Sequence, residues 1–164
     1  EIREKVCTWM ADIIRRQYPE VEVIAGVATG AIAHGYLVAH ILGKPFCYVR
    51  PKPKDHGTGS QIEGILPEGA EVVIVEDLIC TGMSSLAAKN ALVNAGADMM
   101  GMVAIFSYNF NQARKAFEDA NVELTTLTNY DSLIEVAAET GYVKSSDIEV
   151  LKEWRISPPT WGTE

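Results

Sequence analysis

The sequence Val72-Val73-Ile74-Val75-Glu76-Asp77-Leu78-Ile79-Cys80-Thr81-Gly82-Met83-Ser84-Ser85 decides the fold of this chain. An apolar run at residues 72–75 leads into an acidic pair and a turn of small residues, and a helix-compatible segment continues from Ser84 to Asn94. An unbroken short apolar run predicts a strand that is buried on both faces, as in a parallel sheet. The acidic pair would then emerge at the carboxyl end of that strand, where open α/β sheets bind their ligands.

The residues after this strand have the chemistry of a site for a sugar phosphate. The carboxylates of Glu76 and Asp77 can accept hydrogen bonds from the hydroxyls of a ribose. Hydroxyl and N–H groups at a helix N-terminus can bind a 5′-phosphate, and Thr81, Gly82, Ser84 and Ser85 would supply them. The alternative is a strand, a turn and a capped helix that bind nothing. It is the weaker interpretation, because two carboxylates at the end of a buried strand are costly without a partner.

Length and composition indicate one globular domain over residues 1–164 and restrict its partners. The net charge of −8 argues against nucleic acid as the main partner, because phosphate backbones require clustered cations. The three cysteines, Cys7, Cys47 and Cys80, are too far apart for a zinc site or a disulfide framework and fit a reducing cytoplasm. No secretory signal and no apolar run of about 18 residues occurs, so we expect no membrane association.

Predicted strands and helices alternate along the chain. We expect helices at 1–18, 32–42, 84–94, 111–120, 131–140 and 146–154, and strands at 21–26, 46–50, 71–75, within 98–108 and at 122–127. Residues 51–64 are expected to form a long loop and residues 157–164 an extended tail. This order predicts an α/β fold with a mostly parallel central sheet flanked by helices.

A basic loop, residues 50–59, is the second informative segment. Arg50, Lys52, Lys54 and His56 occupy every second position, so an extended backbone would point all four toward one side. A one-sided strip of cations in an acidic protein is suited to hold a pyrophosphate. A solvated loop without a ligand is the alternative, and the nearby acidic strand end makes it the weaker one.

Both segments resemble motifs of known phosphoribosyltransferases. The stretch at 72–85 resembles the phosphoribosyl-pyrophosphate signature of type I phosphoribosyltransferases, and the basic loop resembles the mobile catalytic loop of the orotate phosphoribosyltransferase family. The motifs that carry the second resemblance are Tyr48-Val49-Arg50, Lys54-Asp55-His56-Gly57, Gln61-Ile62-Glu63-Gly64, the turn Thr29-Gly30-Ala31, and Thr125-Thr126-Leu127-Thr128-Asn129-Tyr130. The resemblance covers nearly the whole chain.

The resemblance implies a type I phosphoribosyltransferase fold and a pentosyl transfer from 5-phosphoribosyl 1-pyrophosphate to orotate. The cosubstrate would carry Mg²⁺ without a direct protein ligand, and a homodimer would share its active sites. Lys54, His56 and Asp77 would be catalytic, and Glu76 and Asp77 would bind the ribose hydroxyls. The pyrophosphate would contact Arg50, Lys52, Lys54, His56, Thr29 and Gly30, and the 5′-phosphate would lie against Cys80, Thr81, Gly82, Met83, Ser84 and Ser85.

The chain departs from the family pattern in several places. Cys80 stands where the family usually has Ser or Thr, and Gly30 stands where some relatives carry a lysine. The residues that bind the base cannot be assigned from the sequence, and the motifs of the family's N-terminal hood are absent, so we expect that the chain is truncated or has lost that part. Two alternatives therefore stay open: a purine or other phosphoribosyltransferase, and a non-catalytic module that senses nucleotides.

Overall fold

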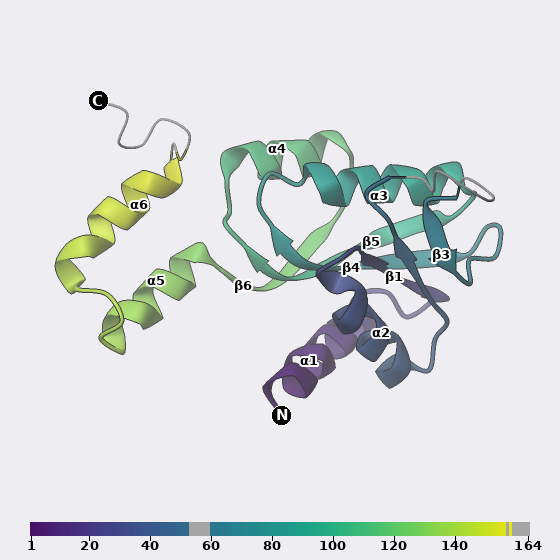
Figure 1. The fold of residues 1–164 in the computed structure, drawn as a ribbon, viewed down its shortest axis with the longest axis horizontal. Helices are drawn as coiled ribbons and strands as arrows, with labels where there is room; N and C mark the ends of the chain where they lie inside the picture. The colour runs from purple at the N-terminus through teal and green to yellow at the C-terminus, as the bar shows by residue number, and fades with distance from the viewer. Residues whose placement is uncertain (53–59, 157, 159–164) are drawn as a thin grey trace.

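A computed structural model describes residues 1–52, 60–156 and 158 of the chain. Its centre is a six-stranded sheet with the order β3-β2-β1-β4-β5-β6 (Figure 1). The strands are β1 (Val23–Val27), β2 (Phe46–Val49), β3 (Ile62–Gly64), β4 (Glu71–Ile79), β5 (Asp98–Ser107) and β6 (Leu124–Asn129). Every neighbouring pair is parallel except β2 and β3, which run antiparallel. The predicted α/β architecture with a mostly parallel sheet is thus confirmed.

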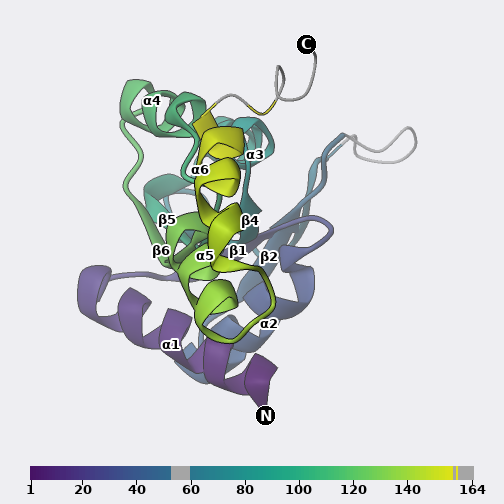
Figure 2. The same ribbon diagram turned by 90° about the vertical axis from the view of Figure 1, so that its left-hand side faces the viewer.

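Helices cover both faces of this sheet. They are α1 (Ile2–Gln17), α2 (Ala31–Leu42), α3 (Met83–Asn94), α4 (Asn111–Asp119), α5 (Tyr130–Glu139) and α6 (Ile148–Ile156). Helices α1 and α2 lie on one face, and α3 and α4 lie on the other (Figure 1). Helices α5 and α6 follow β6 and extend beyond the sheet in Figure 1, and they lie in front of the sheet in Figure 2.

Strand β4 explains why the apolar run is uninterrupted. Successive side chains of a strand point to opposite faces, and in β4 Val72 and Ile74 enter the core beneath α3 and α4. Val73 and Val75 enter the core that α1 and α2 close. A strand between two helical layers needs apolar residues at every position, and a pattern of alternating apolar and polar residues would leave one face of the strand polar.

Two elements differ from the sequence-based expectation. Strand β4 continues to Ile79, so the acidic pair lies within the paired strand, where Glu76 is aligned with Ala104 of β5. Residues 62–64 were expected to be loop but form the edge strand β3. A strand of three residues carries too little alternation to be recognised from sequence.

Among the described residues, no helix combines the length and the apolar character needed to span a membrane.

Candidate active site

The candidate site lies at the carboxyl ends of β1, β2 and β4, which the parallel arrangement brings to one edge of the sheet. The turn after β1, at residues 28–30, contains a cis peptide bond between Ala28 and Thr29. The Ala28 N–H donates to the Val49 carbonyl at the end of β2, at 2.9 Å. The predicted pyrophosphate turn therefore lies directly beside the start of the predicted basic loop.

Asp77 contacts the same turn. Its side chain is half-buried, its Oδ1 accepts a hydrogen bond from the Leu78 N–H at 2.9 Å, and its Oδ2 lies against the Cα atom of Gly30. A Cβ atom at position 30 would lie 2.5 Å from Asp77 Cγ and would overlap Oδ2. A side chain at position 30 would therefore displace the Asp77 carboxylate from this position.

Glu76 does not emerge beside Asp77, and the expectation that both carboxylates face a ligand needs correction. Consecutive residues of an extended strand point to opposite faces, so Glu76 points toward α3 and is only 3 % exposed. Its Oε1 accepts a hydrogen bond from the Asp77 N–H at 3.0 Å, and its Oε2 accepts one from Ser85 Oγ at 2.8 Å. Burial, reinforced by a hydrogen bond involving Asp77, raises the pKa of Glu76 to about 8.

The segment after β4 forms the N-terminus of α3. Gly82 precedes the helix with φ of 80°, a left-handed conformation that suits glycine, and a Cβ atom there would meet the Phe117 ring at 2.8 Å. The Leu86 N–H donates to the Gly82 carbonyl at 2.9 Å, and the N–H groups before it belong to the first helical turn, where no intrahelical acceptor exists. These N–H groups and the positive end of the helix dipole can bind a phosphate.

The predicted phosphate-binding residues are not equally accessible. Cys80, Met83 and Ser84 are exposed, and Thr81 is half-buried. Ser85 is buried, and its hydroxyl donates to Glu76, so what it can offer to an anion is its backbone N–H. The three cysteines are free thiols, and Cys80 is the exposed one.

The structure describes the two ends of the basic loop. The Arg50 N–H donates to the Gln61 carbonyl at 2.8 Å, and Gln61 Nε2 returns a bond to the Arg50 carbonyl at 2.9 Å. Arg50 Nη1 lies 3.8 Å from Glu63 Oε1, and Lys52 is exposed. The loop thus begins and ends at one place beside the 28–30 turn. Lys54 and His56 lie outside the described residues, and their predicted roles stay predictions.

An aromatic groove adjoins the site, and the sequence analysis did not identify it. It encloses about 810 Å³ between the end of the sheet and the α5–α6 segment. Its walls include Leu78, Phe106, Tyr108, Tyr130 and Trp154. The Tyr108 N–H donates to the Ile79 carbonyl at 3.0 Å, which fixes the groove next to the end of β4. Aromatic residues at alternate positions 106, 108 and 110 were the available signal.

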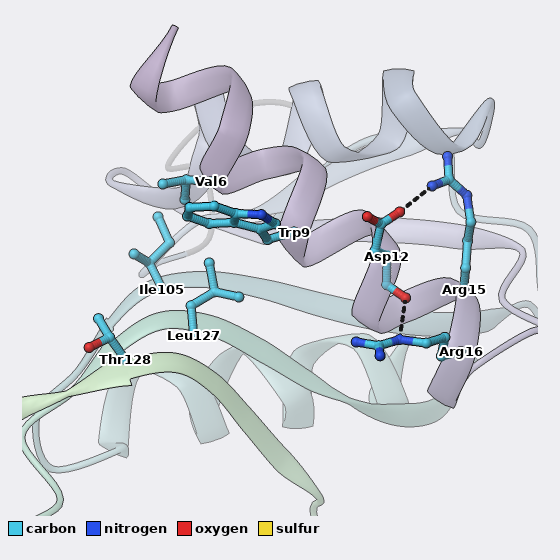
Figure 3. A pocket seen from close by; sticks show the side chains of 8 residues that line it. All are labelled: Val6, Trp9, Asp12, Arg15, Arg16, Ile105, Leu127 and Thr128. Carbon is cyan, nitrogen blue, oxygen red and sulfur yellow. Dashed lines mark hydrogen bonds and ion pairs between the residues drawn. The ribbon is translucent and has the colours of Figure 1, made fainter. Parts of the chain in front are cut away.

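A second cavity, of about 740 Å³, lies between α1 and strands β5 and β6 (Figure 3). The Trp9 ring lies over Ile105 and Leu127 (Figure 3). The charged side chains of this cavity bond to one another or to backbone: Arg15 Nη1 is 2.7 Å from Asp12 Oδ1, and Arg16 Nε donates to the Asp12 carbonyl at 3.2 Å. This cavity lacks the set of a carboxylate, a glycine turn and a helix N-terminus that the carboxyl edge of the sheet provides.

Comparisons with known proteins show the family of the chain. The profile of the phosphoribosyl transferase domain family matches residues 1–142. An orotate phosphoribosyltransferase of Porphyromonas gingivalis is 51 % identical over 162 residues, which are 99 % of this chain and 77 % of that protein. The crystal structure of orotate phosphoribosyltransferase from Aeropyrum pernix superimposes with a TM-score of 0.71 at 27 % identity, over 84 % of this chain and 75 % of that one. Leishmania donovani UMP synthase gives a TM-score of 0.79 over 94 % of this chain and 33 % of that one, and at 19 % identity it supports the fold alone.

Proposed function

The chain belongs to the phosphoribosyl transferase family, and we propose that it is an orotate phosphoribosyltransferase of pyrimidine biosynthesis. The enzyme transfers the phosphoribosyl group of 5-phosphoribosyl 1-pyrophosphate to orotate and yields orotidine 5′-monophosphate and pyrophosphate. The observation that carries the choice of orotate is the 51 % identity to a protein of that name along 99 % of the chain. The Lys54-Asp55-His56-Gly57 motif supports the same choice over a purine base.

The described residues can bind the cosubstrate from two sides. Asp77 would accept hydrogen bonds from the ribose hydroxyls, and the first turn of α3, from Met83 to Ser85, would bind the 5′-phosphate through its N–H groups. The pyrophosphate would lie toward the 28–30 turn and Arg50, where Ala28 bonds to the end of β2. Lys52, Lys54 and His56 would complete the cation strip there.

The chemistry requires charge neutralisation more than it requires a nucleophile. Departure of pyrophosphate places positive charge on the C1–O4 region of the ribose and one further negative charge on the leaving group. Cations fixed around the pyrophosphate stabilise that developing charge, and exclusion of water prevents hydrolysis. Asp77, fixed against Gly30, orients the ribose while its bond to pyrophosphate breaks.

Mg²⁺ is proposed to enter with the cosubstrate. The described residues hold no cluster of three or more His, Cys, Asp or Glu side chains that could bind a metal ion. Mg²⁺ commonly keeps several waters and binds substrate phosphates, so an ion carried on the pyrophosphate needs no direct protein ligand. The ion would supply neutralising charge on the pyrophosphate oxygens.

We further propose a cytoplasmic homodimer with shared active sites, which the free cysteines and the family resemblance support. Mixing inactive Lys54→Ala and Asp77→Asn subunits tests this arrangement. If the loop of one subunit serves the site of the other, mixed dimers contain one intact site and regain activity. If dimers that are verified to be mixed regain no activity, the shared-site arrangement is refuted.

The activity itself is tested with a panel of bases. The protein is incubated with Mg²⁺ and 5-phosphoribosyl 1-pyrophosphate, and orotate, uracil, adenine, guanine and xanthine are offered in turn. Consumption of orotate alone is the expected result. Consumption of a purine would support the alternative phosphoribosyltransferase, and inactivity toward every base despite binding of the cosubstrate would support the nucleotide-sensing alternative.

A further inference from the structure

Glu76 is a buried ionisable group next to the proposed site, and binding of the substrate does not explain why it is there. Its side chain is 3 % exposed, and both carboxyl oxygens already hold protein hydrogen bonds. A carboxyl group buried without hydrogen bonds would be strongly unfavourable, so these bonds are what makes its position tolerable. At 3 % exposure Glu76 offers almost no surface to a ligand, whereas Asp77 is half-buried.

Its two hydrogen bonds connect the two halves of the site. Through Oε1 it holds the N–H of Asp77, the residue that would bind the ribose, at 3.0 Å. Through Oε2 it holds Ser85 Oγ, in the first turn of α3, at 2.8 Å. That turn would bind the 5′-phosphate. The distance between ribose and phosphate groups in the cosubstrate is fixed by covalent bonds, so the protein must hold the two corresponding subsites at a matching separation.

Apolar packing alone leaves this separation less well defined. Helix α3 begins at Met83 after a short turn, and Cys80 and Thr81 in that turn are exposed and half-buried, respectively. A buried hydrogen bond from β4 to Ser85 adds a directional restraint that a contact between aliphatic groups does not provide.

We propose that Glu76 is a positioning residue, which fixes the Asp77 backbone and the N-terminus of α3 relative to each other, and that it does not bind the ribose itself. This inference rests on the proposed function, because it assigns the two subsites to the two ends of 5-phosphoribosyl 1-pyrophosphate. It revises the assignment that the sequence motif suggested for the first residue of the acidic pair.

The test compares Glu76→Gln, Glu76→Ala, Asp77→Asn and Ser85→Ala, with Glu71→Gln at the other end of β4 as the matched control. Gln is nearly isosteric with Glu, can accept from the Asp77 N–H and can bond to Ser85 Oγ. We expect Glu76→Gln to remain within about fivefold of the wild type in kcat/KM for the cosubstrate. Glu76→Ala and Ser85→Ala should raise the KM for the cosubstrate about tenfold or more and change kcat less. Asp77→Asn should lose about 10²-fold.

A direct ligand would give a different pattern. If Glu76→Gln is as defective as Asp77→Asn, the carboxylate charge itself is needed at the ribose and the proposal is overturned. Wild-type KM in Ser85→Ala would overturn it as well, because the link to α3 would then have no effect. If Glu76→Ala fails to fold, the results for Ser85→Ala and Glu76→Gln still decide between the two roles of Glu76.

Calorimetric binding of 5-phosphoribosyl 1-pyrophosphate with Mg²⁺ separates this inference from the choice of base. If the wild type binds the cosubstrate but does not consume orotate, the proposed function fails while the order of affinities among the variants still decides the role of Glu76. Equal affinities of Glu76→Gln and Asp77→Asn would refute the positioning role in that case too.

Discussion

Replacing Gly30 by Ala should damage catalysis while leaving the fold intact. Gly30 has φ of −61° and ψ of −40°, so its backbone is compatible with any L-residue. Replacing glycine at such a position usually gains about 0.4–1 kcal/mol of stability, because the unfolded chain loses conformational freedom. Any damage must therefore arise from what the new methyl group meets.

The methyl group would meet the carboxylate of Asp77. Its Cβ atom would lie 2.5 Å from Asp77 Cγ, whereas carbon atoms in contact sit about 3.5–4.0 Å apart. The carboxylate must retreat by about 1 Å, which is enough to break hydrogen bonds to ribose hydroxyls with an optimum near 2.7 Å. Hydrogen bonds to a charged group are worth about 1.5–3 kcal/mol each, so the loss of one predicts a fall of about 10–150-fold in kcat/KM for the cosubstrate.

The assay measures orotidine 5′-monophosphate formation at saturating orotate while the cosubstrate is varied, and urea unfolding measures stability. The control is the same substitution in an Asp77→Ala background. With the carboxylate removed the clash is gone, so Gly30→Ala should there cost less than about twofold. Two results would refute the contact as the cause. One is an undiminished fall in kcat/KM when Gly30→Ala is added to Asp77→Ala, and the other is a kcat/KM of Gly30→Ala alone within about twofold of the wild type.

Three further predictions follow from the same geometry. Lys54→Ala should lower kcat about 10²–10³-fold without changing the urea midpoint, whereas the exposed Lys115→Ala should change neither; equal turnover in both variants would remove the loop from the mechanism. Burial raises the pKa of Glu76 from 4.5 to about 8 in the folded state. Between these pH values the folded protein therefore binds more protons than the unfolded chain. The free energy of unfolding should consequently fall by about 2–3 kcal/mol from pH 6 to pH 8. Glu76→Gln should lack that part of the slope, and an unchanged slope would argue against the shift. Gly82→Ala combines a left-handed φ with a clash against the Phe117 ring, so it should lower the free energy of unfolding by about 1–3 kcal/mol in urea titrations, and a wild-type value would contradict the turn geometry.

The features that the sequence predicted correctly depend on neighbours in the chain. The apolar run at 72–75 indicates a strand buried on both faces because each of its residues must enter one of two cores. The boundaries of α2, α3 and α4 follow from helical periodicity and from the glycines that flank α2 and precede α3. The sequence analysis missed strand β3 because only its pairing with β2 identifies it as a strand. Three residues of sequence do not reveal such a pairing partner.

The features that the sequence could not predict depend on residues far apart in the chain. Gly30 and Asp77 are separated by 47 positions, and the steric reason for glycine exists only once β1 and β4 are paired. The sequence suggested a missing lysine there, while the structure indicates that a side chain at position 30 would displace the Asp77 carboxylate. The aromatic groove likewise combines residues of β4, β5, α5 and α6, so the alternating aromatic residues at 106, 108 and 110 could indicate only one of its walls.

The acidic pair is best understood as two residues with opposite electrostatic roles. The cosubstrate carries several negative charges, and the chain itself has a net charge of −8, so two ionised carboxylates at the ribose would oppose binding. The alternation of β4 separates them: Asp77 faces the 28–30 turn, and Glu76 enters the core, where burial raises its pKa to about 8 and keeps most of it protonated at neutral pH. The site then presents the Asp77 carboxylate to the ribose, and Glu76 holds the Asp77 N–H and the N-terminus of α3 in place.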